Sequence, residues 1–179
     1  MSANRAILAF SRTCLPVLVA IQTVGFFSAV SPAAAAPTPA PVHVQVTEVF
    51  PESEFLALTN AERAAHGVAP LRLDPELVSA AEAKDYDMDT KDYWDHFRPG
   101  DNKAPWDFID EAGYDYRVAG ENLARGFRTP EGVTKAWMNS PAHRANLLSP
   151  KYTDVGFASI ISYDTGSPVL LTVQMFGAR

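Results

Sequence analysis

In the first two thirds of the segment that follows residue 50, apolar residues recur at helical spacing. Residues 51–66 are predicted to form a helix, which ends before Gly67. Asp74 and Pro75 mark the start of a second helix, whose alanine-rich apolar stripe predicts close packing on a flat surface. Shorter helices are predicted at 104–112 and from Thr129-Pro130 onward. The second helix carries its stripe on Leu77, Ala81, Lys84 and Met88.

The pattern changes to strands near the C-terminus. Residues 154–163 and 168–176 are each rich in β-branched and aromatic residues, with a turn predicted at 164–167 between them. Apolar residues at both odd and even positions indicate burial on both faces. Helices first and an antiparallel hairpin last predict an α+β fold built in layers.

Residues 1–36 have the pattern of a secretory signal peptide. Arg5 and Arg12 precede an apolar stretch, and small alanines at 33–36 supply a cleavage region. An uncleaved membrane anchor is the alternative, although the stretch is short for a span. Residues 37–50 are predicted to be a proline-rich linker, or alternatively to add an edge strand at 42–46. The folded domain is predicted to occupy residues 51–179.

Charge and cysteine content limit the classes of partner. Without Arg5 and Arg12, 13 basic residues face 21 acidic ones, a net charge of −8. This balance disfavours nucleic acid and anionic lipid as partners. Cys14, the one cysteine, lies inside the predicted signal peptide, so the secreted domain is expected to rely on its core without disulfides. We expect a monomer with no transmembrane segment after cleavage.

A run of aspartates at the end of the second helix suggests a calcium loop at first sight. The residues are Asp85, Asp87, Asp89 and Asp92. Their spacing matches only fragments of an EF-hand, and no glycine stands at the sixth position. We therefore predict a solvated helix end.

Two histidines and a glutamate are the candidates for chemistry. Glu121 lies in a segment bounded by Gly120 and Gly126, with His96 upstream and His143 downstream. Two imidazoles and a carboxylate suit a metal site or acid/base chemistry. The predicted helical turn after Ser140 places His143 near a helix N-terminus, where the dipole lowers its pKa and favours the metal-binding neutral form.

Less specific explanations exist for each candidate. The segment around Glu121 is also compatible with a structural turn. His96 lies among aromatic residues and is compatible with a core position. His66, near the end of the first helix, is interpreted as a capping residue.

Several motifs in order resemble the CAP superfamily, also called SCP-like or cysteine-rich secretory, antigen 5 and pathogenesis-related 1 proteins. The resemblance covers about residues 54–177, and the segment Trp137–Leu148 matches the form of the motif found in bacterial members. The matching segments are Leu58–Arg63, Pro70–Leu77, His96 with Pro99, Gly120–Ala124, Trp137–Leu148 and Asp154–Gly156. It implies a three-layer α-β-α sandwich with a central, mainly antiparallel sheet and a cleft on one side.

The same resemblance implies a role for the three candidates. Eukaryotic members present two histidines and two glutamates to the cleft, and His96, Glu121 and His143 match three of these. Ser140 stands at the position of the second glutamate, as in other bacterial members. The family has been linked to divalent metal, to sterols and fatty acids, and occasionally to proteolysis.

Three functions remain open from the sequence. The first is a secreted binding module, not an enzyme, whose cleft holds a small molecule, a lipid or a cell-envelope component. Zinc or another divalent metal is its candidate cofactor, on His96, Glu121 and His143. The second is a metal-dependent hydrolase, with water on the fourth zinc position. The third is a buried polar network with no ligand.

Overall fold

The computed structural model describes residues 50–163 and 168–179. The predicted signal peptide, nearly all of the predicted linker with its alternative strand, and the predicted turn at 164–167 lie outside these residues. The description below therefore concerns the domain that follows them.

The helix starts agree with the sequence prediction. Asp74 caps α2 through Oδ1, which accepts from the backbone N–H groups of Glu76 and Leu77. Thr129 caps α4 in the same way. The first helix ends before Gly67, whose φ of 69° suits glycine. The helices are α1 (Glu52–Ala65), α2 (Pro75–Thr90), α3 (Pro105–Glu111), α4 (Pro130–Asn139) and α5 (Pro141–Leu147).

The strands form one mainly antiparallel sheet with the order β1-β3-β4-β2. Its strands are β1 (Arg72–Leu73), β2 (Val118–Arg125), β3 (Asp154–Ser162) and β4 (Val169–Ala178). β4 pairs antiparallel with both β3 and β2, and β1 pairs parallel with β3. The predicted C-terminal pair is thus confirmed and supplies the centre of the sheet. The turn considered for the segment around Glu121 is wrong: the segment belongs to β2, an edge strand.

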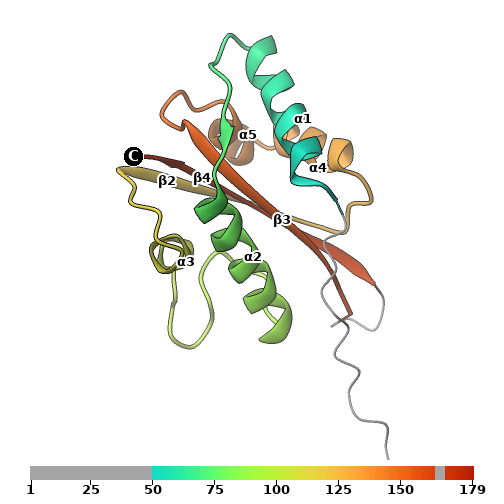
Figure 1. Ribbon diagram of the computed structural model, residues 1–179. Coiled ribbons are helices and arrows are strands. Elements are labelled where there is room, and N and C mark those ends of the chain that lie inside the picture. Colours follow the sequence, from blue (N-terminus) through green and yellow to red (C-terminus); the bar gives the residue numbers. More distant parts are fainter. Residues whose placement is uncertain (1–49, 164–167) are drawn as a thin grey trace, which may run out of the picture. The chain divides into compact units, whose positions relative to one another are not determined.

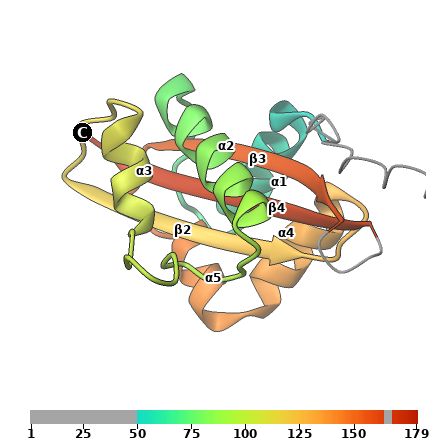
Figure 2. The same cartoon turned by 90° about the horizontal axis from the view of Figure 1, so that it is seen from below.

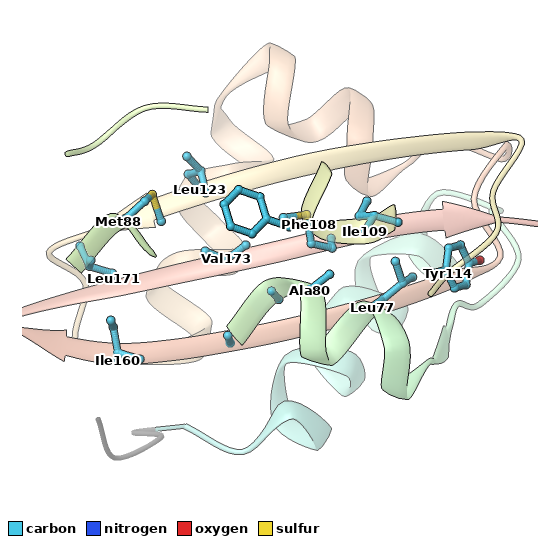
Figure 3. Close-up of a cluster of buried hydrophobic side chains, with 13 residues drawn as sticks. Leu77, Ala80, Met88, Phe108, Ile109, Tyr114, Leu123, Ile160, Leu171 and Val173 are labelled. Carbon is cyan, nitrogen blue, oxygen red and sulfur yellow. The ribbon is translucent and has the colours of Figure 1, made fainter. Parts of the chain in front are cut away.

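Each face of the sheet carries its own hydrophobic core. Figure 1 shows the strands crossing the domain, and in Figure 2 α2 and α3 lie on one side of them with α4 and α5 on the other. The core beneath α2 and α3 includes Leu77, Phe108 and Val173 (Figure 3). The opposite core joins α1, α4 and α5 through Phe55 and Trp137. The three-layer sandwich is therefore confirmed, because the long strands bury both faces.

The close packing predicted for α2 is centred on a glycine of β3. A Cβ atom added to Gly156 would lie 2.1 Å from the backbone carbonyl carbon of Leu77. No side chain fits there, so the backbone of α2 lies directly on the sheet. This contact fixes the position of the helix that leads into the loop carrying His96.

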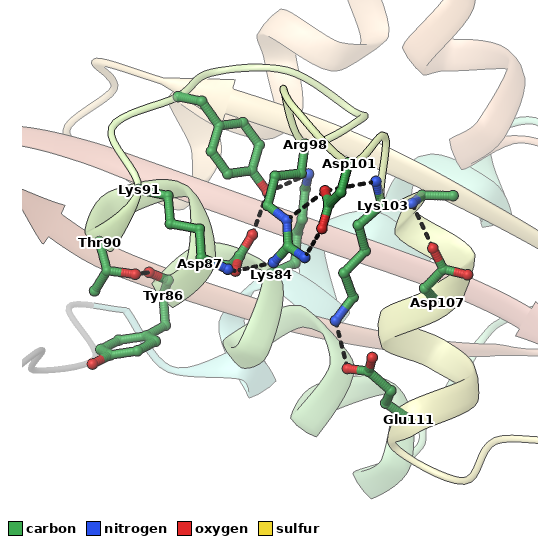
Figure 4. A network of polar contacts seen from close by, with 12 residues as sticks. Lys84, Tyr86, Asp87, Thr90, Lys91, Arg98, Asp101, Lys103, Asp107 and Glu111 are labelled. Atoms are coloured by element: carbon green, nitrogen blue, oxygen red, sulfur yellow. Dashed lines mark hydrogen bonds and ion pairs between the residues drawn. The ribbon is translucent and has the colours of Figure 1, made fainter.

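The prediction of a solvated end for α2 is wrong for two of its aspartates. Asp85 is fully buried, and among residues 50–163 and 168–179 neither of its side-chain oxygens has a hydrogen-bond partner. Asp87 accepts from Lys91 at 2.5 Å, from Tyr93 at 2.7 Å and from Arg98 at 2.8 Å (Figure 4). The helix end is thus tied to the loop that follows, since the loop's side chains surround Asp87.

Candidate functional site

Neighbouring side chains of the edge strand β2 point into different layers of the fold. Glu121 contacts His96, which lies in the loop between α2 and α3. The next residue, Asn122, bonds Gln174 of β4 and Asn146 of α5. Successive residues of a strand point to opposite faces, so β2 connects the two layers at one edge of the sheet.

A short hydrogen bond joins the first two candidates. His96 Nδ1 lies 2.5 Å from Glu121 Oε1, and the side chain of Glu121 is 1% exposed against 48% for His96. The contact with Glu121 raises the pKa of His96, although partial burial opposes it. Burial raises the pKa of Glu121, and the bond from His96 offsets part of this rise. Because an ionised carboxylate only accepts, Nδ1–H donates, and Nε2 remains for a ligand.

A buried lysine supports the loop that carries His96. Lys84 Nζ donates to the carbonyls of Asp95 at 2.9 Å and His96 at 2.8 Å, and contacts Tyr93 Oη at 3.2 Å. Burial lowers the pKa of Lys84, while the nearby charge of Glu121 opposes this effect. Lys84 lies in the apolar stripe predicted for α2, and no role was predicted for it. A lysine in an apolar stripe was the available signal that its ammonium group is buried.

The third candidate, His143, comes from the opposite layer. Its Nδ1 lies 2.8 Å from Ser140 Oγ, so Ser140 stands at the N-cap position but bonds the imidazole. The pKa of His143 is lowered, chiefly by burial and then by the charge of His96. The predicted direction is confirmed, although the structure gives burial rather than the helix dipole as its main cause.

A network of side-chain amides lies behind the histidines. Asn122 donates to Gln174 Oε1 at 3.0 Å and to the carbonyl of His143 at 3.2 Å. Asn146 donates to Asn122 Oδ1 and to the carbonyl of Glu121. Both protons of each amide nitrogen are thereby used, which fixes the spacing between β2 and α5.

Side chains also occupy outward carbonyls of β2. Tyr152 donates to Ala119 at 3.2 Å, Asn146 to Glu121 at 3.0 Å and the Trp137 indole to Leu123 at 3.0 Å. An exposed edge strand is normally a template for another strand. These three donors protect the edge of this sheet.

A cavity of about 430 Å³ lies at this edge. It is lined by Asp95, His96, Phe97, Pro105, Trp106, Ala119, Gly120, Glu121, Asn146 and Tyr152. The structure thus brings His96 and Glu121 together in one cavity, whereas His143 is not among its lining residues. A larger hollow of about 580 Å³, between Met138 and Pro150, is lined by none of the three candidates.

The three candidate metal ligands are already engaged in side-chain contacts. Within residues 50–163 and 168–179, no group of three or more His, Cys, Asp or Glu side chains is placed to hold a metal ion. Glu121 Oε1 is engaged with His96, and Oε2 is buried without a hydrogen-bond partner in this part of the chain. The three-ligand site therefore stays a prediction.

Comparison with known proteins identifies the family. The model of the cysteine-rich secretory protein family, CAP, matches residues 56–176. This chain belongs to the CAP family. The match covers β2 and both histidines, so the cavity lies inside the CAP domain.

The CAP domain also resembles individual bacterial proteins. It is 45% identical to YkwD of Bacillus subtilis over 111 residues, covering 62% of this chain and 43% of that protein. An extracellular SCP-domain protein of Bacillus anthracis matches with 26% identity and a TM-score of 0.62, covering 72% of this chain and 40% of that one. An outer surface protein of Borrelia burgdorferi shares the fold, with 20% identity, a TM-score of 0.64 and coverage of 75% and 99%. This chain thus spans less than half of YkwD.

Across the residues that the structure describes, none of the helices has the length and apolar character needed to cross a bilayer.

Proposed function

We propose that this protein is a secreted CAP domain that binds a small or polymeric ligand in the cavity beside β2. The observation that carries the proposal is the His96–Glu121 pair in a cavity of about 430 Å³. Ligand sites are commonly concave, with volumes of ~300–1,000 Å³ and a few fixed polar groups. A purely structural network is less well supported, because the side chain of His96 is 48% exposed.

The histidines also suit a divalent metal such as zinc, in an arrangement different from the predicted one. Nδ1 of His96 is held by Glu121 and Nδ1 of His143 by Ser140, so both Nε2 atoms remain as donors. A carboxylate that bonds the second nitrogen of a ligating histidine is common around metals, since it fixes the tautomer and orientation of the ring. Glu121 would then orient His96, and the metal would coordinate a hydroxyl or carbonyl oxygen of a ligand. This arrangement favours binding over hydrolysis, since Glu121 would not be a free general base.

We expect zinc to bind the mature protein through the two histidines. His96→Ala and His143→Ala should each weaken binding at least about tenfold, and Glu121→Gln should weaken it ~10–100-fold by releasing His96. Protons compete with zinc for the neutral imidazole. Because the pKa of His96 is raised, zinc affinity should begin to fall at a pH above the usual histidine range and should fall further as the pH decreases. Calorimetric titration at several pH values measures this.

His66→Ala is the matched control, because His66 is exposed, lies outside the cavity lining and has its ring nitrogens against the Glu62 carbonyl and the Arg144 guanidinium. It should leave zinc affinity unchanged. Equal zinc affinity in wild type, His96→Ala and His143→Ala would place the metal elsewhere.

We expect the mature protein to start after the alanines at 33–36. The apolar stretch that follows Arg5 and Arg12 should direct export and then be removed. N-terminal sequencing of protein from the culture medium or cell envelope measures this start. Recovery of a chain that begins at Met1 would contradict secretion by cleavage.

A further inference from the structure

The loop carrying His96 follows the edge of β2. The ring of Trp94 lies 5.9 Å from the guanidinium carbon of Arg125, at the end of the strand. His96 meets Glu121 in the middle, and Phe97 and Trp106 line the cavity together with Ala119. Residues 119–125 of an extended strand span about 20 Å. Aromatic side chains therefore lie toward both ends of this stretch, with the polar pair between them.

Two of these aromatic side chains are accessible. Trp94 is 37% exposed and Phe97 is 43% exposed. Both lie in one loop that Lys84 holds by the carbonyls of Asp95 and His96. Aromatic rings supply large apolar faces at a low cost in side-chain entropy. Their spacing beside polar groups suits a ligand that alternates apolar faces with hydroxyl groups.

The charges at the cavity disfavour an anionic ligand. Its lining contains the carboxylates of Asp95 and Glu121 but neither lysine nor arginine. His96 offsets Glu121, with which it is paired. In the metal-free cavity a phosphate or carboxylate ligand would therefore meet Asp95 without a lining lysine or arginine to pair with, whereas a neutral ligand carries no such penalty.

The edge of β2 is also poorly suited to an added peptide strand. Strand addition uses the free backbone groups of an edge. Here Tyr152, Asn146 and Trp137 already donate to outward carbonyls of Ala119, Glu121 and Leu123. An added peptide strand would therefore find these three carbonyls already occupied.

We propose that the cavity beside β2, together with the exposed ring of Trp94 next to Arg125, binds a linear neutral glycan. Sugar rings would pack on Trp94 and Phe97, and their hydroxyl groups would bond Asn146 and the His96–Glu121 pair. This inference rests on the proposed function, since it names the ligand class of the same cavity.

Titration of the mature protein with neutral oligosaccharides tests this inference. The probes are chitotetraose and cellotetraose, followed by calorimetry and by backbone amide shifts. At least one should bind, with shifts concentrated in residues 94–97 and 119–125. Trp94→Ala and Phe97→Ala should each weaken binding at least tenfold. Tyr86→Ala is the matched control, because Tyr86 is an exposed aromatic residue of α2 outside the cavity lining.

Further probes separate the alternatives. A hyaluronan tetrasaccharide represents anionic glycans, deacetylated chitosan represents cationic ones, and a valine- and threonine-rich hexapeptide represents an added strand. Tighter binding of any of these than of the neutral glycans would overturn the inference. It would also be overturned if Trp94→Ala behaved like Tyr86→Ala.

The outcome also distinguishes the inference from the proposed function. If zinc binds through the histidines but neither neutral glycan binds, the glycan inference is wrong and the proposed binding function still holds. If the protein binds no zinc and none of the probes shifts the amide signals of residues 119–125, the glycan inference and the proposed binding function are both wrong.

Discussion

Replacing Arg63 with methionine is expected to lower the free energy of unfolding by about 3–5 kcal/mol. Arg63 is 1% exposed, and its guanidinium donates to four backbone carbonyls. The acceptors are Ala69 at 2.7 Å, Leu147 at 2.7 Å, Ser149 at 3.0 Å and Tyr152 at 3.3 Å. Methionine fills similar space but leaves these acceptors without their donor. Each buried carbonyl that loses its partner costs ~1–3 kcal/mol, and local relaxation recovers part of the sum.

Chemical denaturation of wild type and variant at one pH measures this loss. Arg128→Met is the matched control, because Arg128 is exposed, and it should change the unfolding free energy by less than about 0.5 kcal/mol. Arg63→Lys should recover little stability, since an ammonium group cannot reproduce the planar fork of donors. A loss below 1 kcal/mol for Arg63→Met would contradict the assigned role.

The arginine also connects the fold to the cavity. Three of its acceptors lie between the end of α5 and the start of β3, and Tyr152 in this connection donates to Ala119 of β2. The same ring stands against Gly120, where an added Cβ would lie 2.3 Å from its hydroxyl oxygen. One wall of the cavity therefore depends on a side chain of α1, far from the cavity in sequence.

Local chemistry explains which elements could be predicted from the sequence. Asp74 and Thr129 set helix starts through bonds to residues two or three positions away, so the sequence alone reveals them. The strand β2 lacks such a signal. Its central residues Gly120, Glu121 and Asn122 have low strand propensity, and it forms by pairing with β4, about 50 residues later.

The same distinction holds for the site. The contact between His96 and Glu121 followed from the family resemblance, because neither spacing nor periodicity links residues that are 25 apart. Lys84 and Asp85 lie on the buried face of α2, and Asp85 follows Ala81 by one helical turn. The run of acidic residues concealed this signal, since four aspartates close together usually indicate a solvated surface. Only the packing of α2 on the sheet shows that Asp85 is buried.

Replacing Asp85 with asparagine is expected to stabilise the protein at neutral pH by more than about 1 kcal/mol, because the variant avoids the cost of a buried group that ionises in the unfolded chain; a rise of one pKa unit is worth about 1.4 kcal/mol. Asp85 is 0% exposed, and neither carboxyl oxygen has a hydrogen-bond partner in the described chain. Burial raises its pKa well above the ordinary value, and the charges of Asp89 and Glu121 raise it further. Asparagine has the same shape but never ionises.

The pH dependence distinguishes this cause from better packing. A carboxyl group whose pKa is higher in the folded state stabilises the fold only below its unfolded pKa, near ~3.9, and this contribution is lost as the pH rises toward the folded pKa. The free energy of unfolding of the variant should therefore equal that of wild type near pH 4 and exceed it increasingly as the pH rises. Denaturation curves from pH 4 to pH 8 measure the difference, with Asp115→Asn as an exposed control. A lower stability of Asp85→Asn at neutral pH would show instead that the ionised carboxylate is held by a favourable partner.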